Sequence, residues 1–311
     1  MKTETKLTGF AKYAWFTLFY NIVVILWGVF LRASKSGDGC GQHWLTCHGE
    51  VIPSAPELKT IIEFSHRITS ALAFFTVLGL LIWAFRKFKK GSSIRKTAVA
   101  SLIFVITEAL VGAGLVLTGN TAETLSVARP CWMAGHLINT FILLALLSLT
   151  AWYASGGKRF DFKTEPKVLM FLIIALIGIF FVGMSGSVAA LSSMLFPSET
   201  LTEGFAKDFS ATSNILLRLR VSHPILSILT GVYLIFLAGW LRKKSENNAI
   251  VGHWSNVLSV LILMQIGFGA LTLLTLAPIL MQIGHLFLAD AVWITFVLLT
   301  ASFLSEEKRI I

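Results

Sequence analysis

Eight apolar runs, each about 20 residues long, constrain this chain more than any other feature of its sequence. An α-helix of that length crosses a hydrocarbon core of about 30 Å. In lipid the backbone polar groups must be satisfied inside the helices themselves, so the chain needs no large aqueous core. The sequence therefore predicts an all-α integral membrane protein with eight transmembrane helices. The runs cover approximately residues 13–32, 64–85, 97–118, 132–153, 168–187, 219–241, 250–273 and 281–303.

The charged residues support this prediction and add an orientation. Only 14% of the residues are charged, against roughly 25% in a soluble domain. Of the 26 lysine and arginine residues, 18 fall in segments that are cytoplasmic if the N-terminus is inside, such as 86–96 and 242–244. This positive-inside bias predicts that both termini are cytoplasmic. The net charge of +10 then reflects topology and contact with membrane lipid, and nucleic acid is not expected as a partner.

The first apolar run is expected to be a retained span and not a cleaved signal. It is longer than the apolar core of a typical signal peptide, and no small-x-small cleavage site follows it. No mitochondrial transit peptide is expected before it, because the short segment upstream includes Glu4. The predicted location is a bacterial plasma membrane, with the chain crossing it several times.

The spans form two similar sets of four. At an offset of 157 residues, the matches are Ser65-His66 with Ser222-His223, Trp83 with Trp240, Glu108 with Gln265, and Gly112-Ala113 with Gly269-Ala270. At an offset of 149 residues, Gly135-His136-Leu137 matches Gly284-His285-Leu286. Internal repeats of like orientation are known in membrane proteins. We therefore predict two tandem pseudo-symmetric four-helix bundles, an N-terminal domain at 1–155 and a C-terminal domain at 156–311.

Four histidines recur in this repeat, one near the outer end of each even-numbered span: His66, His136, His223 and His285. Haem iron takes two axial imidazoles, and a helix bundle presents such ligands from facing helices. A single histidine in a span could instead be a hydrogen-bonding residue between helices, but four at repeated positions favour ligation. Zinc is the weaker alternative, because no third ligand recurs with each pair. The pattern predicts bis-histidine haem ligation in at least one half.

Glu63 distinguishes the first half from the second, because its counterpart 157 residues later is Arg220. Glu63 precedes His66 by three residues, so both lie on one face of a helix. A carboxylate in only one half indicates that this half performs the chemistry, with acid–base or charge-stabilising work for Glu63. The structural alternative is a salt bridge from Glu63 to Arg67, four residues later.

Two cysteines lie in a glycine-rich loop after the first span, on the side predicted to face outwards. Because that side is oxidising, Cys40 and Cys47 are a disulfide candidate, either within one chain or between two. Cys131 is left over and is expected to be a free thiol. Three further histidines do not repeat and are treated as loop or interface residues: His43, His48 and His253.

In combination these residues resemble the haem A synthase family. The resemblance runs from about residue 20 to 303 and rests on Leu31-Arg32, Ser36-Gly37, the Cys40 to Cys47 loop, and segments 62–67, 135–140, 218–224 and 285–290. Members of this family oxidise the C8 methyl group of haem O to a formyl group through successive hydroxylations. The activity that the resemblance implies is therefore that of an oxidoreductase in haem A biosynthesis for cytochrome oxidase.

The resemblance also implies roles for individual residues. His66 and His136 would bind the iron of the substrate haem O, and His223 and His285 would bind the iron of a haem B cofactor that transfers electrons. Glu63 would be the catalytic carboxylate, and the two loop cysteines match those of the family. The implied partners are haem O, haem O synthase and an electron acceptor, with homo-oligomers also compatible with the sequence.

Two features depart from the family pattern, and two other functions compete with it. Segment 188–217 lacks the second cysteine pair that many relatives carry, and the arginine and glycine after the first span are not echoed after the fifth. One competing function is a quinol-linked di-haem electron carrier of the b type; the other is a haem transfer protein. The carrier would not explain why Glu63 and the cysteine loop occur in one half only. The transfer protein would need weaker, exchangeable ligation.

Overall fold

The structure, a computed structural model, describes residues 7–160, 165–246 and 248–305. Within these ranges the chain forms ten helices, and no strand is present apart from one isolated bridge between Cys47 and Glu50. Five of the basic residues behind the predicted orientation lie outside the described residues, as do both ends of the chain: Lys2, Lys6, Lys163, Lys308 and Arg309.

Eight helices are long and apolar enough to cross a membrane, which confirms the prediction of an all-α, multi-pass membrane protein. Their bounds are α1 Gly9–Ala33, α2 Leu58–Lys87, α3 Ser93–Leu117, α4 Ala128–Ala154, α5 Pro166–Leu195, α8 Ser222–Lys244, α9 Ala249–Leu274 and α10 Ile279–Leu304. The short α7 (Ile215–Arg220) extends the span of α8. Several helices begin before the apolar runs, because polar residues can continue a helix beyond the hydrocarbon layer.

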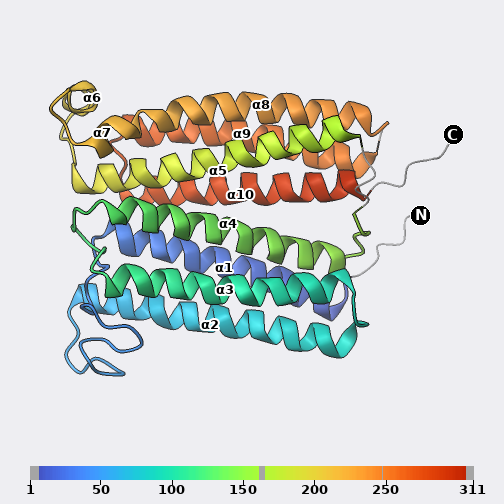
Figure 1. Ribbon diagram of the computed structural model, residues 1–311, viewed down its shortest axis with the longest axis horizontal. Coiled ribbons are helices and arrows are strands. Elements are labelled where there is room, and N and C mark those ends of the chain that lie inside the picture. Colours follow the sequence, from blue (N-terminus) through green and yellow to red (C-terminus); the bar gives the residue numbers. More distant parts are fainter. Residues whose placement is uncertain (1–6, 161–164, 247, 306–311) are drawn as a thin grey trace.

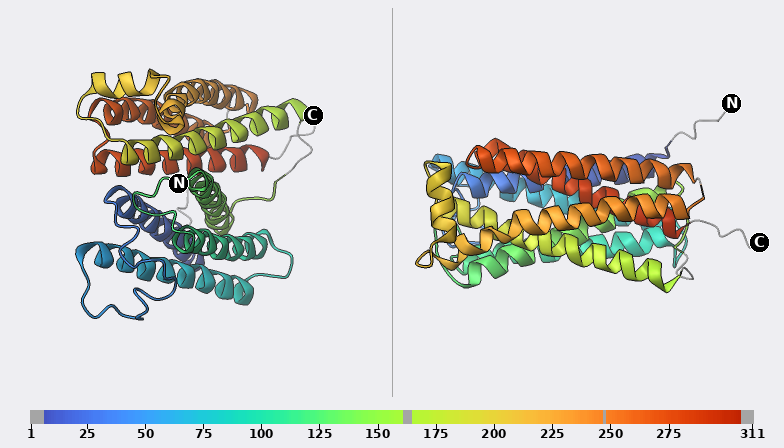
Figure 2. Two further views of the ribbon diagram at one scale, coloured as in Figure 1. Left: turned by 60° about the vertical axis from the view of Figure 1, so that its left-hand side comes forward. Right: turned by 90° about the horizontal axis from the view of Figure 1, so that it is seen from above.

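The helices lie roughly parallel to one another in two groups (Figure 1). Helices α1 to α4 lie together along one side, and α5, α8, α9 and α10 lie along the other. The left-hand view of Figure 2 shows the same grouping. Across the groups, α4 contacts α5 and α10, and α1 contacts α10. The domain boundary between residues 155 and 156 and the pseudo-symmetry of the bundles remain predictions.

An aromatic cluster joins the two groups. Trp293 of α10 is 4% exposed and stacks on Phe141 of α4, with ring centroids 5.4 Å apart. Its Nε1–H also donates a 2.7 Å hydrogen bond to the carbonyl oxygen of Phe141, and Phe180 of α5 lies 5.8 Å from its ring. Large buried aromatic rings contribute much of the packing energy at such contacts. This cluster fixes α4, α5 and α10 relative to one another.

One end of the bundle carries the longer connections, residues 34–57 and 118–127 together with α6 (Leu201–Phe209), and we call it the disulfide end. The sequence predicted a loop over 188–217, but α5 continues to Leu195 and α6 and α7 fill much of the remainder. Thr200 caps α6 by accepting a hydrogen bond from the backbone N–H of Glu203. A hydrogen bond from Lys207 lowers the pKa of the Glu203 carboxyl. Local capping and charge pairing therefore form a helix where no apolar run signals one.

Candidate functional site

The loop after α1 is fastened onto the start of α2 by a disulfide and by close backbone packing. Cys40 and Cys47 are bonded within the chain, which confirms the disulfide prediction, and Cys131 is free and exposed as expected. A side chain at Gly39 would place its Cβ 2.3 Å from the carbonyl of Lys59, so only glycine fits there. The hydroxyl of Thr60 donates a 2.6 Å hydrogen bond to the carbonyl oxygen of Gly39.

Glu63 lies beneath this loop, one turn from the first repeated histidine, and is 2% exposed. Its Oε2 accepts a 2.9 Å hydrogen bond from the backbone N–H of Cys40, and its Oε1 lies 2.5 Å from Nη2 of Arg67. Arg67 also donates to the carbonyl oxygen of Thr46, at 2.7 Å. The salt bridge offered as a structural alternative is therefore present. It also holds the carboxylate in one orientation, so it does not compete with a chemical role.

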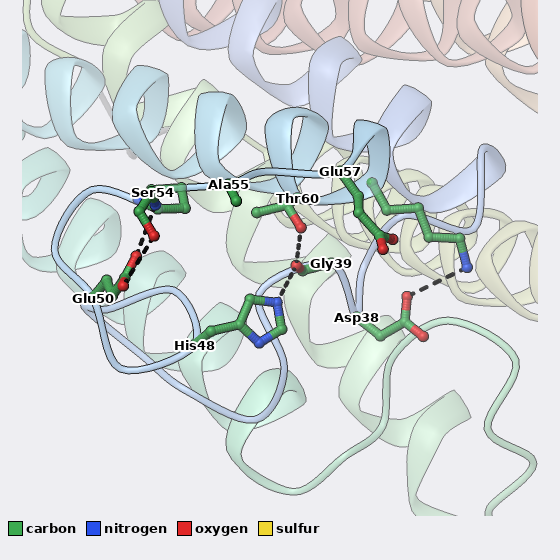
Figure 3. Close-up of a pocket in the computed structure, with 10 residues that line it drawn as sticks. Asp38, Gly39, His48, Glu50, Ser54, Ala55, Glu57 and Thr60 are labelled. Carbon is green, nitrogen blue, oxygen red and sulfur yellow. Dashed lines mark hydrogen bonds and ion pairs between the residues drawn. The ribbon is translucent and has the colours of Figure 1, made fainter.

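A polar cavity of about 520 Å³ lies between the loop and the first turn of α2 (Figure 3). Ser54 donates two hydrogen bonds to the carboxylate of Glu50 beside it, and the ring nitrogen Nε2 of His48 lies 2.8 Å from the carbonyl oxygen of Gly39. The four repeated histidines do not line this cavity. It therefore belongs to the loop and is separate from the histidine pairs.

The first histidine pair comes from α2 and α4. His66 and His136 each lie eight residues after the start of their helices, Leu58 and Ala128. The ring of His66 lies against Gly28 of α1, 3.1 Å from where a Cβ would be. The Nδ1 atoms of both rings are buried without a hydrogen-bond partner.

A carboxylate that the sequence analysis used only as a repeat marker contacts this pair. Oε1 of Glu108 lies 3.3 Å from Nδ1 of His136, although the two are not aligned as a hydrogen bond. Thr140 and Asn139 each donate a 2.5 Å hydrogen bond to Glu108, one to each oxygen. An acidic residue in the middle of an apolar span is a signal of function. That signal could have identified Glu108 from the sequence.

The second histidine pair joins α8 and α10. The ring centroids of His223 and His285 are 6.2 Å apart and the rings are perpendicular. Each ring lies against a glycine, Gly186 of α5 and Gly269 of α9, 2.9 Å from where a Cβ would be. The amide nitrogen Nε2 of Gln265 lies 3.4 Å from Nε2 of His285. In this half an amide takes the place that Glu108 holds in the first half.

Both pairs have the donors that a haem iron requires. Imidazole nitrogens bind metals at about 2 Å, so two rings that share one iron have centroids roughly 6 Å apart. The separation of His223 and His285 fits that requirement. Ring nitrogens without a hydrogen-bond partner occur in both halves, at Nδ1 of His66, His136 and His285, and in the first half the space next to Gly112 is open. A flat macrocycle suits an opening beside a residue without a side chain.

Eight helices that can cross a membrane, with two histidine pairs among them, define a class of multi-pass helical membrane protein with paired imidazole side chains. Comparison with known sequences makes this more specific. The chain belongs to the family of cytochrome oxidase assembly proteins (COX15-CtaA), which it matches over residues 11–297. This range includes both histidine pairs, Glu63 and the disulfide loop.

Individual relatives carry two different names. The chain is 29% identical to the Heme A synthase of Halalkalibacterium halodurans over 88% of its own length and 90% of that protein. It is 28% identical to the Heme A synthase of Alkalihalophilus pseudofirmus over 78% of its length and 80% of that protein. It is also 44% identical to the Protoheme IX farnesyltransferase of Thermus thermophilus over 99% of its length, but spans only 50% of that protein. The resemblance to haem A synthases is thereby confirmed.

Proposed function

We propose that this chain is a haem A synthase, an oxidoreductase that converts the C8 methyl group of haem O to a formyl group. The proposal is carried by the match to proteins named Heme A synthase, which extends over 90% of the Halalkalibacterium halodurans protein. The chemistry of the first half supports it, because a buried carboxylate lies one helical turn from a histidine of the first pair.

The two histidine pairs have different roles in this proposal. His66 and His136 hold the iron of the substrate haem O, while His223 and His285 hold a haem B cofactor. When bound, haem B supplies one-electron transfer. The perpendicular, closely spaced rings of the second pair support tight axial ligation. The first pair has a neighbouring carboxylate, Glu108 beside His136, which supports a site where charge changes during the reaction.

Glu63 acts at the substrate methyl group. Successive hydroxylations of a methyl to an aldehyde add oxygen to one carbon and remove electrons, which pass to an external electron acceptor, and protons, so the site needs a proton acceptor or a negative charge beside that carbon. The carboxylate of Glu63 is buried and is fixed by Arg67 on one oxygen and by the Cys40 N–H on the other. A fixed carboxylate can accept a proton or stabilise developing positive charge without first reorganising.

The disulfide end faces outwards in this proposal, and the membrane is a bacterial plasma membrane. At the end of α2 that is far from the disulfide end, the last turn contains Arg86 and Lys87, and Lys89 and Lys90 follow just beyond it. Basic residues concentrate on the cytoplasmic side of membrane proteins, and disulfides persist on the oxidising outer side. The two features agree on one orientation.

The relatives named farnesyltransferase indicate a pathway partner of this chain, and we do not assign farnesyl transfer to the chain itself. This chain spans about half the length of those relatives, and it matches the Heme A synthases over most of their length. The shared part is therefore the part that haem A synthases also have. We infer that a protohaem farnesyltransferase, which would produce the haem O substrate, is the pathway partner of this chain.

Haem analysis after co-expression tests the proposal. Membranes that contain this chain and a source of haem O are extracted, and the haems are separated by chromatography. We expect haem A from the wild-type chain and none from His66→Ala. Unchanged haem O in the wild-type sample would favour the electron carrier. Haem O formed from protohaem and farnesyl diphosphate by this chain alone would favour a farnesyltransferase.

A further inference from the structure

Two arginines at the disulfide end have no negatively charged partner among the residues that the structure describes. Arg129 of α4 is 3% exposed, its guanidinium donates to the carbonyl oxygen of Thr124 at 2.6 Å, and its Nε is unpaired. Arg32 of α1 is partly buried and donates to the side-chain oxygen of Gln282 at 3.0 Å. Arg32 lies in the last turn of α1 and Arg129 in the first turn of α4, and these two helices contact each other, so both side chains start from neighbouring helix ends.

Unpaired buried cations are costly, since transfer out of water is compensated only by a counter-charge or good hydrogen bonds. Other arginines at this end meet that need. Arg67 pairs with Glu63, and Arg220 pairs with Asp208, each at 2.5 Å. Arg32 and Arg129 have only neutral partners. Their positions therefore suit an anion that binds between them.

Both arginines lie in line with the first histidine pair. Arg32 follows Gly28, which contacts His66, by four residues, and Arg129 precedes His136 by seven. These spacings keep each arginine on the same helix face, displaced towards the disulfide end by about 6 Å and about 10 Å respectively. The equivalent positions in the second half are Ala190 and Pro278. The arginine pair is thus a feature of the first half alone.

We propose that Arg32 and Arg129 bind the two propionate carboxylates of the haem that is held between His66 and His136. The inference rests on the proposed function and extends it to substrate orientation. A planar guanidinium can donate two parallel hydrogen bonds to a carboxylate, which lysine cannot do. Two guanidiniums near one another match the two carboxylates on one edge of a haem.

We call Arg32 and Arg129 together the propionate clamp. This clamp determines which edge of the macrocycle faces Glu63. The C8 methyl group shares its pyrrole ring with one of the propionates, so it lies near the propionate edge. With the propionates on Arg32 and Arg129, that edge points to the disulfide end, towards which Glu63 lies one turn beyond His66. The opposite edge, which carries the apolar farnesyl chain, then points to the membrane interior. The clamp therefore selects the methyl groups at one edge and excludes those at the other.

Haem binding by the purified full chain, with its second-half haem in place, tests the clamp. Protohaem and its propionate dimethyl ester are titrated separately and followed by their optical spectra. The binding phase that is scored is the one that His66→Ala removes. The ester keeps the iron and its axial ligation but cannot pair with arginine. Because the two ligands partition differently into detergent, the decisive quantity is the ratio of their affinities in each variant.

We expect Arg32→Gln and Arg129→Gln each to weaken binding of protohaem about tenfold while ester binding stays within about twofold. Arg129→Lys should fall between Arg129→Gln and wild type, because it keeps the charge but not the bidentate geometry. Lys35→Gln removes one exposed positive charge at the same end and should leave the ratio unchanged. The same ratio in wild type and in both glutamine variants would overturn the clamp. This titration measures binding and no turnover, so its result does not depend on haem A formation. A failure to form haem A in the co-expression experiment would therefore count only against the proposed function.

Discussion

The two halves of the molecule support one histidine each in the same way but surround their histidines with different charges. In each half a histidine of an even-numbered span lies against a glycine of the preceding odd-numbered span, Gly28 with His66 and Gly186 with His223. The neighbours then diverge. The first half has Glu63 and Glu108 where the second half has Arg220 and Gln265. The shared features are those that axial ligation by a pair of imidazoles would require under the proposed function.

Under the proposed function, the differences correspond to what an oxidation site would need in addition. A haem that only passes electrons works best with neutral, fixed surroundings, and Gln265 provides such a neighbour for His285. A site that removes protons from carbon needs groups that hold charge, and the first half has two fixed carboxylates. The connections at the disulfide end also differ between the halves. The loop after α1 is closed by the Cys40–Cys47 disulfide, whereas the segment around α6 and α7 is held by the Arg220–Asp208 ion pair.

Removal of one histidine from each half should have the largest effect. His285→Ala takes one axial ligand from the second half, so the stably bound low-spin haem B should be lost. His136→Ala should abolish haem A formation and leave that haem B in place. Optical spectra of the purified variants and extracted haems give both results. A full bis-histidine spectrum in both His223→Ala and His285→Ala would contradict the assignment of the second half.

Glu63→Gln should have the next largest effect. The amide is nearly isosteric, so the fold and the haem B of the second half should persist. Haem A formation should fall by roughly two or more orders of magnitude, which is the range for a positioned acid or base. Haem O or its hydroxymethyl form should accumulate in the extracted haems. Glu57→Gln, at the exposed start of the same helix, is the matched control, and normal haem A yield from Glu63→Gln would make the carboxylate purely structural.

Much of the fold could be predicted from the sequence, because the membrane imposes one length and one composition on every span. All eight spans, the free Cys131 and the Cys40–Cys47 disulfide were predicted. The helix starts were not, since polar residues such as Thr60 and Glu63 extend α2 beyond its apolar run. The short helix α6 also escaped prediction, because it depends on capping and charge pairs that leave no apolar periodicity.

The contacts of the candidate site were only partly predictable. The repeat identified the four histidines, but it did not show that His66 and His223 lie against glycines of α1 and α5. An offset of 158 residues between Gly28 and Gly186 would have shown it, had the comparison included the first and fifth spans. The contacts of Glu108 could be seen only in the three-dimensional structure, because its partners His136, Asn139 and Thr140 come from another helix.

An exchange of the residues at 108 and 265 would sharpen the comparison further. Glu108→Gln gives the first half the amide of the second, and activity should fall about tenfold, as is typical when a group behind a metal ligand is changed. The loss of a negative charge beside His136 should also raise the reduction potential of a haem bound there. Gln265→Glu should lower the potential of the second-half haem. Redox titrations followed optically measure both, and unchanged potentials would mean that these residues only pack.

The smallest effect is expected from the disulfide loop. In the chain-entropy model a bridge over so short a segment contributes about 2 to 3 kcal/mol, but Gly39 stays attached to α2 through Thr60 in its absence. The Cys40→Ser/Cys47→Ser double variant should therefore insert normally and lose roughly threefold to tenfold in haem A formation, less than Glu63→Gln. The physical reason is that the Cys40 N–H then holds Oε2 of Glu63 less firmly. Cys131→Ser is the matched control and should behave as wild type. Full turnover in the double variant would show that the bridge does not position the carboxylate, and the covalent difference between the two loops would then have no part in the chemistry.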